Sequence, residues 1–503
     1  MALGSEKRVA VALAAVLLVG GFAIRLVGLT DPPLGFHPTR QYHGLIVARA
    51  MYVADRPSVS AQERRTAQLN RSRDIQLEPP LLERVVATGY VVAGHEVTWL
   101  GRLLSMLAWL GGGLALFALA RRVFDLTAAG VALAFYVFVP YGIEAGRSFQ
   151  PDPLMVALTV TTLLLVVRHH ETPTMRRLLA AAVVGGVAVL VKGVSVFPIA
   201  AVFASLAVVR HGWRRVLLQR EVWVFGAIAL LPSLAFYVYG VATGGQLQSQ
   251  FKMTFIPRLF TQRFFWSGWW NQVDTVVSGP IAVVALAGSL VLARSAVQRA
   301  LVVGWWLGYL LYAASVPYHI ATHNYYQLPV VPIVSLGLGL VATAAARGLG
   351  TAGMQMAPPV LAALLLAVLV VAAARRVHPV PPSDAHARVA LYERIGALAG
   401  HSDGVLMLSN DYGYGLRYHG DVSGLSWPER IDDRLTRLQG KTVTSLDVRF
   451  RALARSIQAE WFAVVDMGEW KYQVSLHRYL DAHATRVASS SQFVLYRLDG
   501  ATA

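Results

Sequence analysis

Ten polar residues of chemically reactive types lie near the predicted outer ends of apolar segments. They are His37, Arg40, Glu78, Arg147, Asp152, Lys192, His319, His323, Tyr325 and Tyr326. Arginine and lysine bind anionic oxygens, whereas carboxylates and imidazoles can accept a proton. A charged side chain costs about 2.5–3.5 kcal/mol at the centre of a bilayer and less near its faces. Their gathering at one face therefore predicts a water-filled cavity with a function there.

Long apolar segments must position these residues. Because 55% of the 503 residues are hydrophobic and only 15% are charged, the chain has more apolar surface than a soluble core of ordinary proportions would bury. We predict a polytopic α-helical membrane protein with about eleven transmembrane helices, since each segment is long enough to cross a bilayer. The predicted segments are residues 9–28, 98–119, 127–144, 153–168, 178–191, 194–209, 222–240, 279–293, 300–317, 326–345 and 357–374.

Arginines mark alternate loops between these segments. They are Arg121 and Arg122, then Arg168, Arg176 and Arg177, then Arg210, Arg214, Arg215 and Arg220, then Arg294 and Arg299, then Arg347. Such enrichment is typical of cytoplasmic loops, so we expect the N-terminus inside and the C-terminus outside. The net charge of +17 follows partly from this topology, and we expect no nucleic-acid partner. The absence of cysteine excludes disulfides and thiolate chemistry.

Three regions do not fit the bilayer. Residues 1–375 form the predicted transmembrane domain, with a first outer loop at 30–97 that carries surface helices and an aromatic outer loop at 242–278. Residues 376–503 are predicted to form a small extracytoplasmic α/β domain. Its expected strands are Val405–Leu408, Trp461–Val465 and Phe493–Tyr496, and its expected helices are 386–399 and 470–482.

Several short motifs follow one another in a distinctive order. They are Glu78-Pro79-Pro80, Arg102, the segment 147–154, Lys192-Gly193 and the segment 323–329. Over about residues 9–345 this order resembles the polyprenyl-phosphate-sugar glycosyltransferases of the GT-C fold. That group includes the protein O-mannosyltransferases and the aminoarabinose transferase of lipid A. The resemblance implies a membrane enzyme that moves a sugar from a lipid phosphate to an acceptor hydroxyl.

The resemblance also implies roles for single residues. Glu78, Asp152 and Lys192 match a glutamate, an aspartate and a lysine of the family. One position departs from the pattern, because the family usually has an acidic pair directly after the residues that match His37-Pro38, and its aspartate is taken as the catalytic base. This sequence has Thr39-Arg40 there. Either another acid acts as the base, or the active site is altered, or the protein is no longer a transferase.

The expected reaction needs cations for the departing phosphate and one group that accepts a proton. For the phosphate we expect Arg40, Arg147, Lys192 and His323. For the proton we expect Glu78 first, Asp152 second and His37 third, with Tyr325, Tyr326 and Gln41 contacting the substrate. We expect no cofactor, and no metal is indicated, because no third ligand follows His319 and His323.

Simpler structural roles compete with these assignments. Glu78 could cap a helix, and Asp152 could be an N-cap followed by a proline. Arg147 and Lys192 could lie at helix ends with their charges in the interface. The tyrosines could belong to an aromatic belt.

The sequence thus predicts an inverting glycosyltransferase in the plasma or inner membrane of the cell. Its expected partners are a polyprenyl-phosphate-linked sugar donor, membrane lipids, and an acceptor lipid, glycan or protein at the outer face. A transporter or flippase of a lipid-linked sugar would share the spans and cations but would need no base. Many such folds carry internal repeats, and no repeated halves are visible here. A non-catalytic member of the family is the third alternative.

Overall fold

The computed structural model describes residues 2–74, 78–243, 255–351, 366–372, 374–375 and 381–498. The chain divides into two compact units. The membrane unit consists of Met1–Leu29, Gln76–Pro79 and Arg102–Val377. The sheet unit consists of Thr30–Ile75, Pro80–Gly101 and His378–Ala503. Most of the predicted outer loop 30–97 therefore folds with the C-terminal region.

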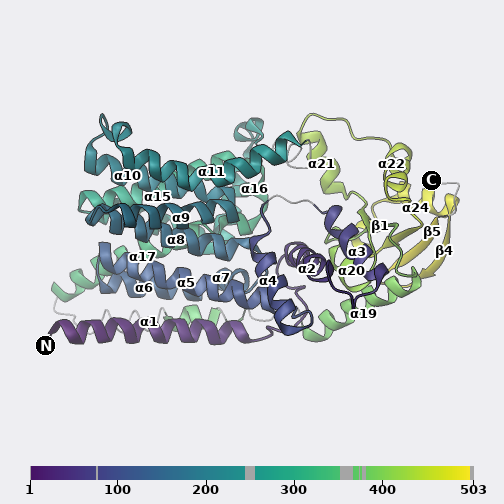
Figure 1. Ribbon diagram of the computed structural model, residues 1–503, viewed down its shortest axis with the longest axis horizontal. Coiled ribbons are helices and arrows are strands. Elements are labelled where there is room, and N and C mark those ends of the chain that lie inside the picture. The colour runs from purple at the N-terminus through teal and green to yellow at the C-terminus, as the bar shows by residue number, and fades with distance from the viewer. Residues whose placement is uncertain are drawn as a thin grey trace. The chain divides into compact units, whose positions relative to one another are not determined.

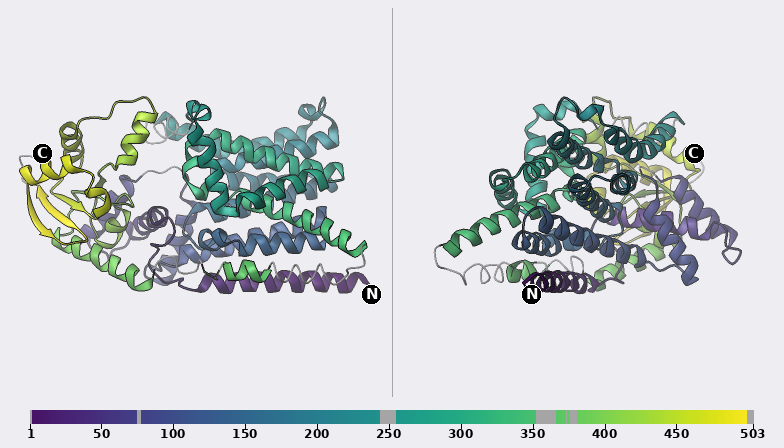
Figure 2. Two further views of the ribbon diagram at one scale, coloured as in Figure 1. Left: turned by 180° about the vertical axis from the view of Figure 1, so that it is seen from behind. Right: turned by 60° about the vertical axis from the view of Figure 1, so that its left-hand side comes forward.

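The membrane unit is a bundle of helices that run side by side, with α1 at its edge (Figures 1 and 2). Its helices are α1 (Ala2–Leu26), α5 (Leu100–Val123), α6 (Leu126–Phe138), α7 (Pro140–Gly146), α8 (Pro151–Glu171), α9 (Met175–Val191), α10 (Val196–His211), α11 (Arg220–Ala242), α13 (Arg263–Val277), α14 (Gly279–Leu292), α15 (Ala296–Ser315), α16 (Pro317–Thr322) and α17 (Val330–Thr351). Short 3-10 turns are η1 (Gly193–Ser195), η2 (Val216–Leu218), η3 (Pro257–Thr261) and η4 (Asn324–Gln327).

The predicted spans coincide with helices from 9–28 through 326–345, whereas residues 357–374 lie largely outside the described residues. Among the described residues, six helices are long and apolar enough to cross a membrane, or up to eight if each bent pair is one span. The bent pairs are α6 with α7, at 64°, and α13 with α14, at 87°. The aromatic segment predicted as an outer loop thus contains a helix, α13. The number of spans stays a prediction.

A buried arginine holds the bend between α6 and α7. Pro140 at the start of α7 has no N–H to donate, so the α-helical hydrogen bonds are interrupted at Val139. Arg25 of α1 is fully buried, and its guanidinium donates to the carbonyls of Val137 at 2.9 Å and Gly142 at 3.0 Å. These bonds satisfy carbonyls on both sides of the bend and set the direction of α7.

Small residues allow the helices of this unit to approach closely. A Cβ on Gly337 of α17 would lie 2.4 Å from the carbonyl oxygen of Ala285 in α14. A Cβ on Gly308 of α15 would lie 2.5 Å from Pro198 of α10. Larger side chains at these glycines would push the helix pairs apart, as is typical of helix packing in membranes.

The sheet unit contains a five-stranded sheet of order β2-β1-β3-β5-β4, in which β2, β1 and β3 are parallel and β5 and β4 antiparallel. The strands are β1 (Val405–Leu408), β2 (Gly424–Ser426), β3 (Trp461–Val464), β4 (Ala484–Ser489) and β5 (Val494–Leu498). The helices are α2 (Pro38–Val53), α3 (Ala61–Ser72), α4 (Leu81–Ala93), α19 (Pro382–Leu398), α20 (Tyr414–His419), α21 (Arg430–Leu438), α22 (Leu446–Ile457), α23 (Met467–Trp470) and α24 (Val474–His483).

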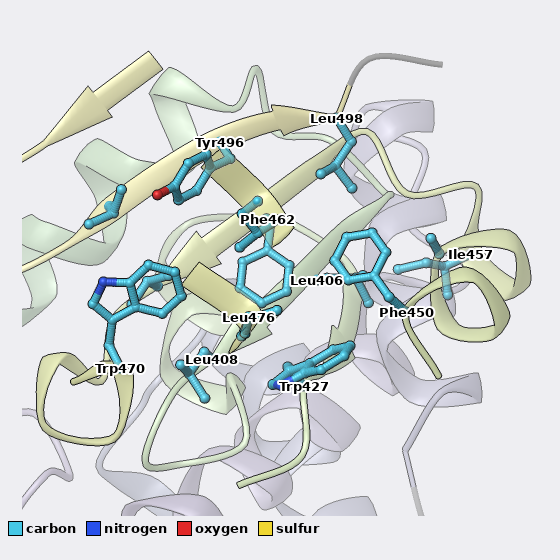
Figure 3. Packing of buried hydrophobic residues seen from close by; sticks show 14 residues of the cluster. Leu406, Leu408, Trp427, Phe450, Ile457, Phe462, Trp470, Leu476, Tyr496 and Leu498 are labelled. Carbon is cyan, nitrogen blue, oxygen red and sulfur yellow. The ribbon is translucent and has the colours of Figure 1, made fainter. Parts of the chain in front are cut away.

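Both faces of this sheet are covered, which explains why its central strands are continuously apolar. On one face Leu406 and Phe462 pack with Phe450 of α22 and Leu476 of α24 (Figure 3). On the other face Val405, the residue next to Leu406, packs with residues of α19 and α20. Alternate side chains of one strand therefore belong to two separate cores.

The predicted surface helix after His37 is formed, but protein covers its apolar side. Tyr42, Leu45 and Ile46 of α2 are buried, and α2 contacts α3, α4 and α20. Tyr42 also meets His419 of α20, with 3.0 Å between its hydroxyl oxygen and Nε2. Burial, reinforced by nearby Arg49, lowers the pKa of His419 to about 4, so this imidazole is neutral at physiological pH. Helical periodicity alone could not distinguish a membrane surface from another protein surface as the cover.

Candidate active site

A buried ion pair joins the start of α8 to the end of α9. Lys192 Nζ lies 2.7 Å from Asp152 Oδ1, and the two side chains are 5% and 1% exposed. Gln150 is the N-cap of α8 and Pro151 follows at its first turn, so Asp152 is inside the helix and not its cap. Lys192 is the C-cap of α9. In the described part of the chain, Asp152 Oδ2 has no hydrogen-bond partner.

The rings of two tyrosines cover the lysine of this pair. Lys192 Nζ lies 4.7 Å from the ring centroid of Tyr326 and 5.3 Å from that of Tyr325, so both tyrosines make cation–π contacts. Tyr312 donates to the backbone oxygen of Tyr326 at 2.8 Å and fixes the turn η4. The aromatic residues that were open to a belt role therefore contact the predicted phosphate-binding cation directly.

Two histidines extend this aromatic cluster. His319 stacks on Tyr326 with 5.0 Å between ring centroids, and His323 lies 5.5 Å from His319 and 5.6 Å from Tyr325. Thr322 and His323 form a further hydrogen bond of 2.8 Å through Nδ1. His323 is thus in the same cluster as Lys192, as the phosphate-binding prediction requires.

Helix α7 adds two groups that the sequence analysis missed. Tyr141 donates a hydrogen bond of 2.7 Å to Asn324 Oδ1 and so connects α7 to η4. The Tyr141 hydroxyl lies within electrostatic reach of Asp152, Glu144 and Tyr325. Glu144 is 7% exposed, which makes it a second buried carboxylate near the ion pair. The sequence could have indicated Glu144, because an acid within a predicted apolar span marks a functional site by default.

Gln150 is a third residue that the sequence analysis did not select. Its side chain is 1% exposed, and neither atom of its amide has a hydrogen-bond partner among the described residues. A buried amide without partners is costly and is usually satisfied by water or a ligand. Its position two residues before Asp152 makes it a candidate for substrate contact.

Glu78 belongs to the membrane unit, although the helix that follows it belongs to the sheet unit. Pro80 is the N-cap of α4, so Glu78 does not cap this helix. The carboxylate of Glu78 acts electrostatically on Tyr237 of α11, and the backbone of Gly193 forms a hydrogen bond with the same tyrosine. Tyr237 therefore connects Glu78 with the residue next to Lys192.

Arg147 has a structural contact in the membrane unit. Its guanidinium donates to the carbonyl of Val27, just after α1. Arg102 donates to the next two carbonyls, those of Gly28 at 3.1 Å and Leu29 at 2.6 Å. The two arginines hold the turn that follows α1, and a phosphate-binding role for Arg147 stays a prediction.

The remaining predicted residues, His37, Arg40 and Gln41, belong to the sheet unit. His37 precedes Pro38 and has a φ of 42°, a left-handed conformation that is uncommon outside glycine. Gln41 donates to the backbone oxygen of Phe36 at 2.7 Å and holds this turn. Their catalytic, phosphate-binding and substrate-binding roles stay predictions.

The described residues contain no group of three or more His, Asp or Glu side chains arranged to hold a metal ion. The two histidines that raised the question of a metal, His319 and His323, instead contact each other and Tyr326 through their rings.

The membrane unit is thus a helix bundle with a buried lysine–carboxylate pair at the ends of two of its helices, and a small α/β region follows it in the sequence. Residues 77–239 match the family of dolichyl-phosphate-mannose-protein mannosyltransferases. This range contains Glu78, Asp152 and Lys192. No curated protein sequence matches the chain.

Solved structures share the fold over the whole chain. The apo form of ArnT from Cupriavidus metallidurans is 17% identical, with a TM-score of 0.58 over 100% of this chain and 99% of that one. ArnT bound to undecaprenyl phosphate is also 17% identical, with a TM-score of 0.58 over 98% of each chain. The archaeal oligosaccharyltransferase AglB from Archaeoglobus fulgidus, in complex with an inhibitory peptide and a dolichol-phosphate, is 12% identical. It has a TM-score of 0.57 over 98% of this chain and 75% of that one.

These likenesses establish the fold. With the family match, they confirm the predicted class, the membrane glycosyltransferases that use polyprenyl-phosphate sugars.

Proposed function

We propose that this protein transfers a sugar from a polyprenyl phosphate to an acceptor hydroxyl, with inversion at the anomeric carbon. The observation that supports it best is the Asp152–Lys192 pair beneath the rings of Tyr325 and Tyr326. Lys192 is buried between aromatic rings, and the carboxylate of Asp152 fixes its position. Such a lysine can bind an anionic group of the substrate.

The reaction requires few groups. The acceptor oxygen attacks the anomeric carbon, the bond from this carbon to the phosphate oxygen breaks, and the phosphate leaves with the bonding electrons. Lys192 has three N–H donors, and the one directed at Asp152 leaves two for phosphate oxygens. His323, in its protonated form, adds a further donor from the same cluster, and Arg40 and Arg147 are the other proposed phosphate ligands.

A carboxylate accepts the acceptor's proton, a contribution of roughly 10² to 10⁴ in rate. Glu78 is our first candidate, because it does not serve as the cap of α4 and lies near Tyr237 and Gly193. Asp152 is the second, since only its Oδ1 is engaged by Lys192. His37 is the third, and the structure adds Glu144 for testing.

The donor and the location are proposed from the same class. An undecaprenyl or dolichol phosphate carrier is consistent with the ligands of ArnT and AglB. The acceptor is a lipid, glycan or protein hydroxyl at the outer face of the plasma or inner membrane, with the N-terminus cytoplasmic.

A transfer assay with labelled polyprenyl-phosphate sugars tests the proposal. The purified protein should transfer label, and Glu78→Gln should abolish transfer while donor binding is nearly unchanged. Glu171→Gln is the matched control, because Glu171 ends α8 and so lies at the opposite end of this helix from Asp152. It should leave transfer unchanged.

The other carboxylates decide between the outcomes. If Glu78→Gln keeps full turnover while Asp152→Asn or Glu144→Gln loses it, the base is the residue that fails. If the parent protein transfers none of the donors but moves a lipid-linked sugar across vesicles, it is a flippase and the proposal is wrong.

A further inference from the structure

A cavity lies at the end of the membrane unit opposite the candidate active site. Helix α17 begins at Val330, just after η4, and its last turns line this cavity from Leu340 to Thr351. Twenty-two helical residues extend about 33 Å. The cavity measures about 480 Å³, within the range of about 300–1,000 Å³ that is usual for small-molecule sites. It is therefore separate from the Asp152–Lys192 pair.

Two arginines give this cavity an excess of positive charge. Arg294 and Arg347 line it together with a single carboxylate, Asp125. Arg347 donates to Asp125 Oδ2 at 3.0 Å, but 64% of the Arg347 side chain stays exposed. Asp125 also accepts from Thr343 at 2.9 Å and from the backbone N–H of Ala128 at 2.8 Å. Both oxygens of its carboxylate thus accept hydrogen bonds within the protein.

The second arginine, Arg294, directly precedes the N-cap of α15. Its backbone N–H and that of Ser295 both donate to Gln298 Oε1, at 2.9 and 3.1 Å, in the capping box that starts α15. Within the described residues, the guanidinium of Arg294 makes no hydrogen bond or ion pair. The first turn of α15 adds the partial positive charge of a helix N-terminus to the same place.

The remaining wall is apolar. Phe124, Leu292 and Leu340 line the cavity beside the arginines. A ligand that fits must carry an anionic oxygen group and an apolar part on the same molecule. Free phosphate would leave the apolar wall in contact with water, whereas a phospholipid satisfies both surfaces.

We propose that this cavity binds the phosphate headgroup of an anionic phospholipid. Arg294 and Arg347 contact the phosphate, and Leu292 and Leu340 contact the adjoining glycerol and acyl carbons. The cavity lies at the end of the bundle where α5 ends in Arg121 and Arg122. Basic pockets between helices at an anionic leaflet are suited to such headgroups.

Native mass spectrometry of the full chain tests this site. The protein should retain phosphatidylglycerol in preference to phosphatidylcholine. Arg294→Gln should weaken phosphatidylglycerol binding roughly fivefold, the effect of one basic side chain near anionic lipid. Arg176→Gln is the control, because Arg176 is an exposed arginine of the same end, just inside α9, and does not line the cavity. It should leave binding unchanged.

Competition distinguishes the lipid from a soluble phosphate. Millimolar inorganic phosphate or glycerol 3-phosphate should not displace the bound phosphatidylglycerol. Displacement by inorganic phosphate, equal retention of both lipids, or equal weakening by the two variants would overturn the proposal. Equal thermal unfolding of the two variants confirms that a loss of lipid reflects the missing guanidinium and not the fold.

Discussion

At the scale of single residues, the Asp152–Lys192 pair is the most consequential feature. Burying two charges costs several kcal/mol for each ion, and their attraction offsets this cost only when geometry is good. Well-packed apolar residues would fill the same place without this desolvation cost. The pair is therefore better explained by a function for Lys192 than by a contribution to folding.

Removing one partner of this pair should be severe. Lys192→Met leaves Asp152 charged and uncompensated, so we expect a loss of about 3–5 kcal/mol in the free energy of unfolding. The double variant Lys192→Met with Asp152→Asn removes both charges and should recover much of this loss. Denaturation of the purified protein in detergent measures both values.

Stability and activity should then separate. The double variant is expected to be folded but inactive in transfer, because the phosphate has lost its lysine. A double variant that is as unstable as the single one would show that the charge is not what destabilises the protein.

At the scale of elements, a bent helix positions the site. Arg25 satisfies carbonyls on both sides of the bend between α6 and α7, and Tyr141 of α7 is bonded to Asn324 of η4. The bend thus directs α7 toward the turn that carries Tyr325 and Tyr326.

Tyr141→Phe tests this connection. It removes the hydroxyl that donates to Asn324, so we expect about 0.5–1.5 kcal/mol less stability and a lower transfer rate. Tyr136→Phe is a matched control, because Tyr136 is a buried tyrosine of α6 whose hydroxyl has no hydrogen-bond partner among the described residues. Thermal unfolding and the transfer assay, run on both variants, should show a deficit only for Tyr141→Phe; an equal deficit in both would refute the role of the bond.

Helix α21 of the sheet unit should respond to pH. Its N-cap is Glu429, and burial, together with Asp432, Asp466, Glu469 and Asp411, raises the pKa of this carboxyl to about 7. The folded protein then holds the proton more tightly than the unfolded chain. The protonated Glu429 carboxyl therefore stabilises the folded protein fully below about pH 4.5, and this stabilisation is lost as the pH rises through about 7.

Glu429→Gln removes this titration but keeps an oxygen that can cap the helix. The variant should gain stability relative to the parent at pH 8 and show little gain at pH 5. Thermal unfolding at both pH values measures the difference. The control is Glu393→Gln, at an exposed position of α19, which should change the stability by the same amount at pH 5 and pH 8. An equal change at both pH values for Glu429→Gln would contradict the prediction.

At the scale of the whole molecule, the arginine pattern predicts how the chain is oriented in the membrane. Because arginines mark alternate loops, a reporter fused after residue 215 should read cytoplasmic and one fused after residue 400 should read external. The same reading at both positions would refute the topology. A fusion after Arg122, expected inside, is the internal control.

Much of this architecture follows from apolar patterns. The runs at β1, β3 and β5 predicted their strands, because both faces of the sheet are covered. The edge strand β4 was missed, since most of its side chains are exposed and show no apolar pattern. The bend at Val139 was missed because Val139 and Pro140 lie within one apolar run.

The candidate site could be predicted only in part. Asp152, Lys192, His323 and the tyrosines were expected in one cavity, and the membrane unit brings them together. Their pairing joins residues 40 positions apart, a contact that no local pattern indicates. Glu144 is the last residue of the predicted segment 127–144, where an acid can also lie at the face of the bilayer, and Gln150 carries no charge, so neither was selected.

The sheet unit is assembled from distant parts of the chain, and this has a consequence for its synthesis. Asn70 donates to the backbone oxygen of Val422, 352 residues later. At roughly 5–20 residues per second, the ribosome needs tens of seconds to add that length. During this interval α2 and α3 lack the C-terminal segments that they contact in the folded sheet unit. The nascent protein therefore exposes apolar surface to proteases and chaperones during synthesis. This surface becomes covered only when the last quarter of the chain has been made and has folded.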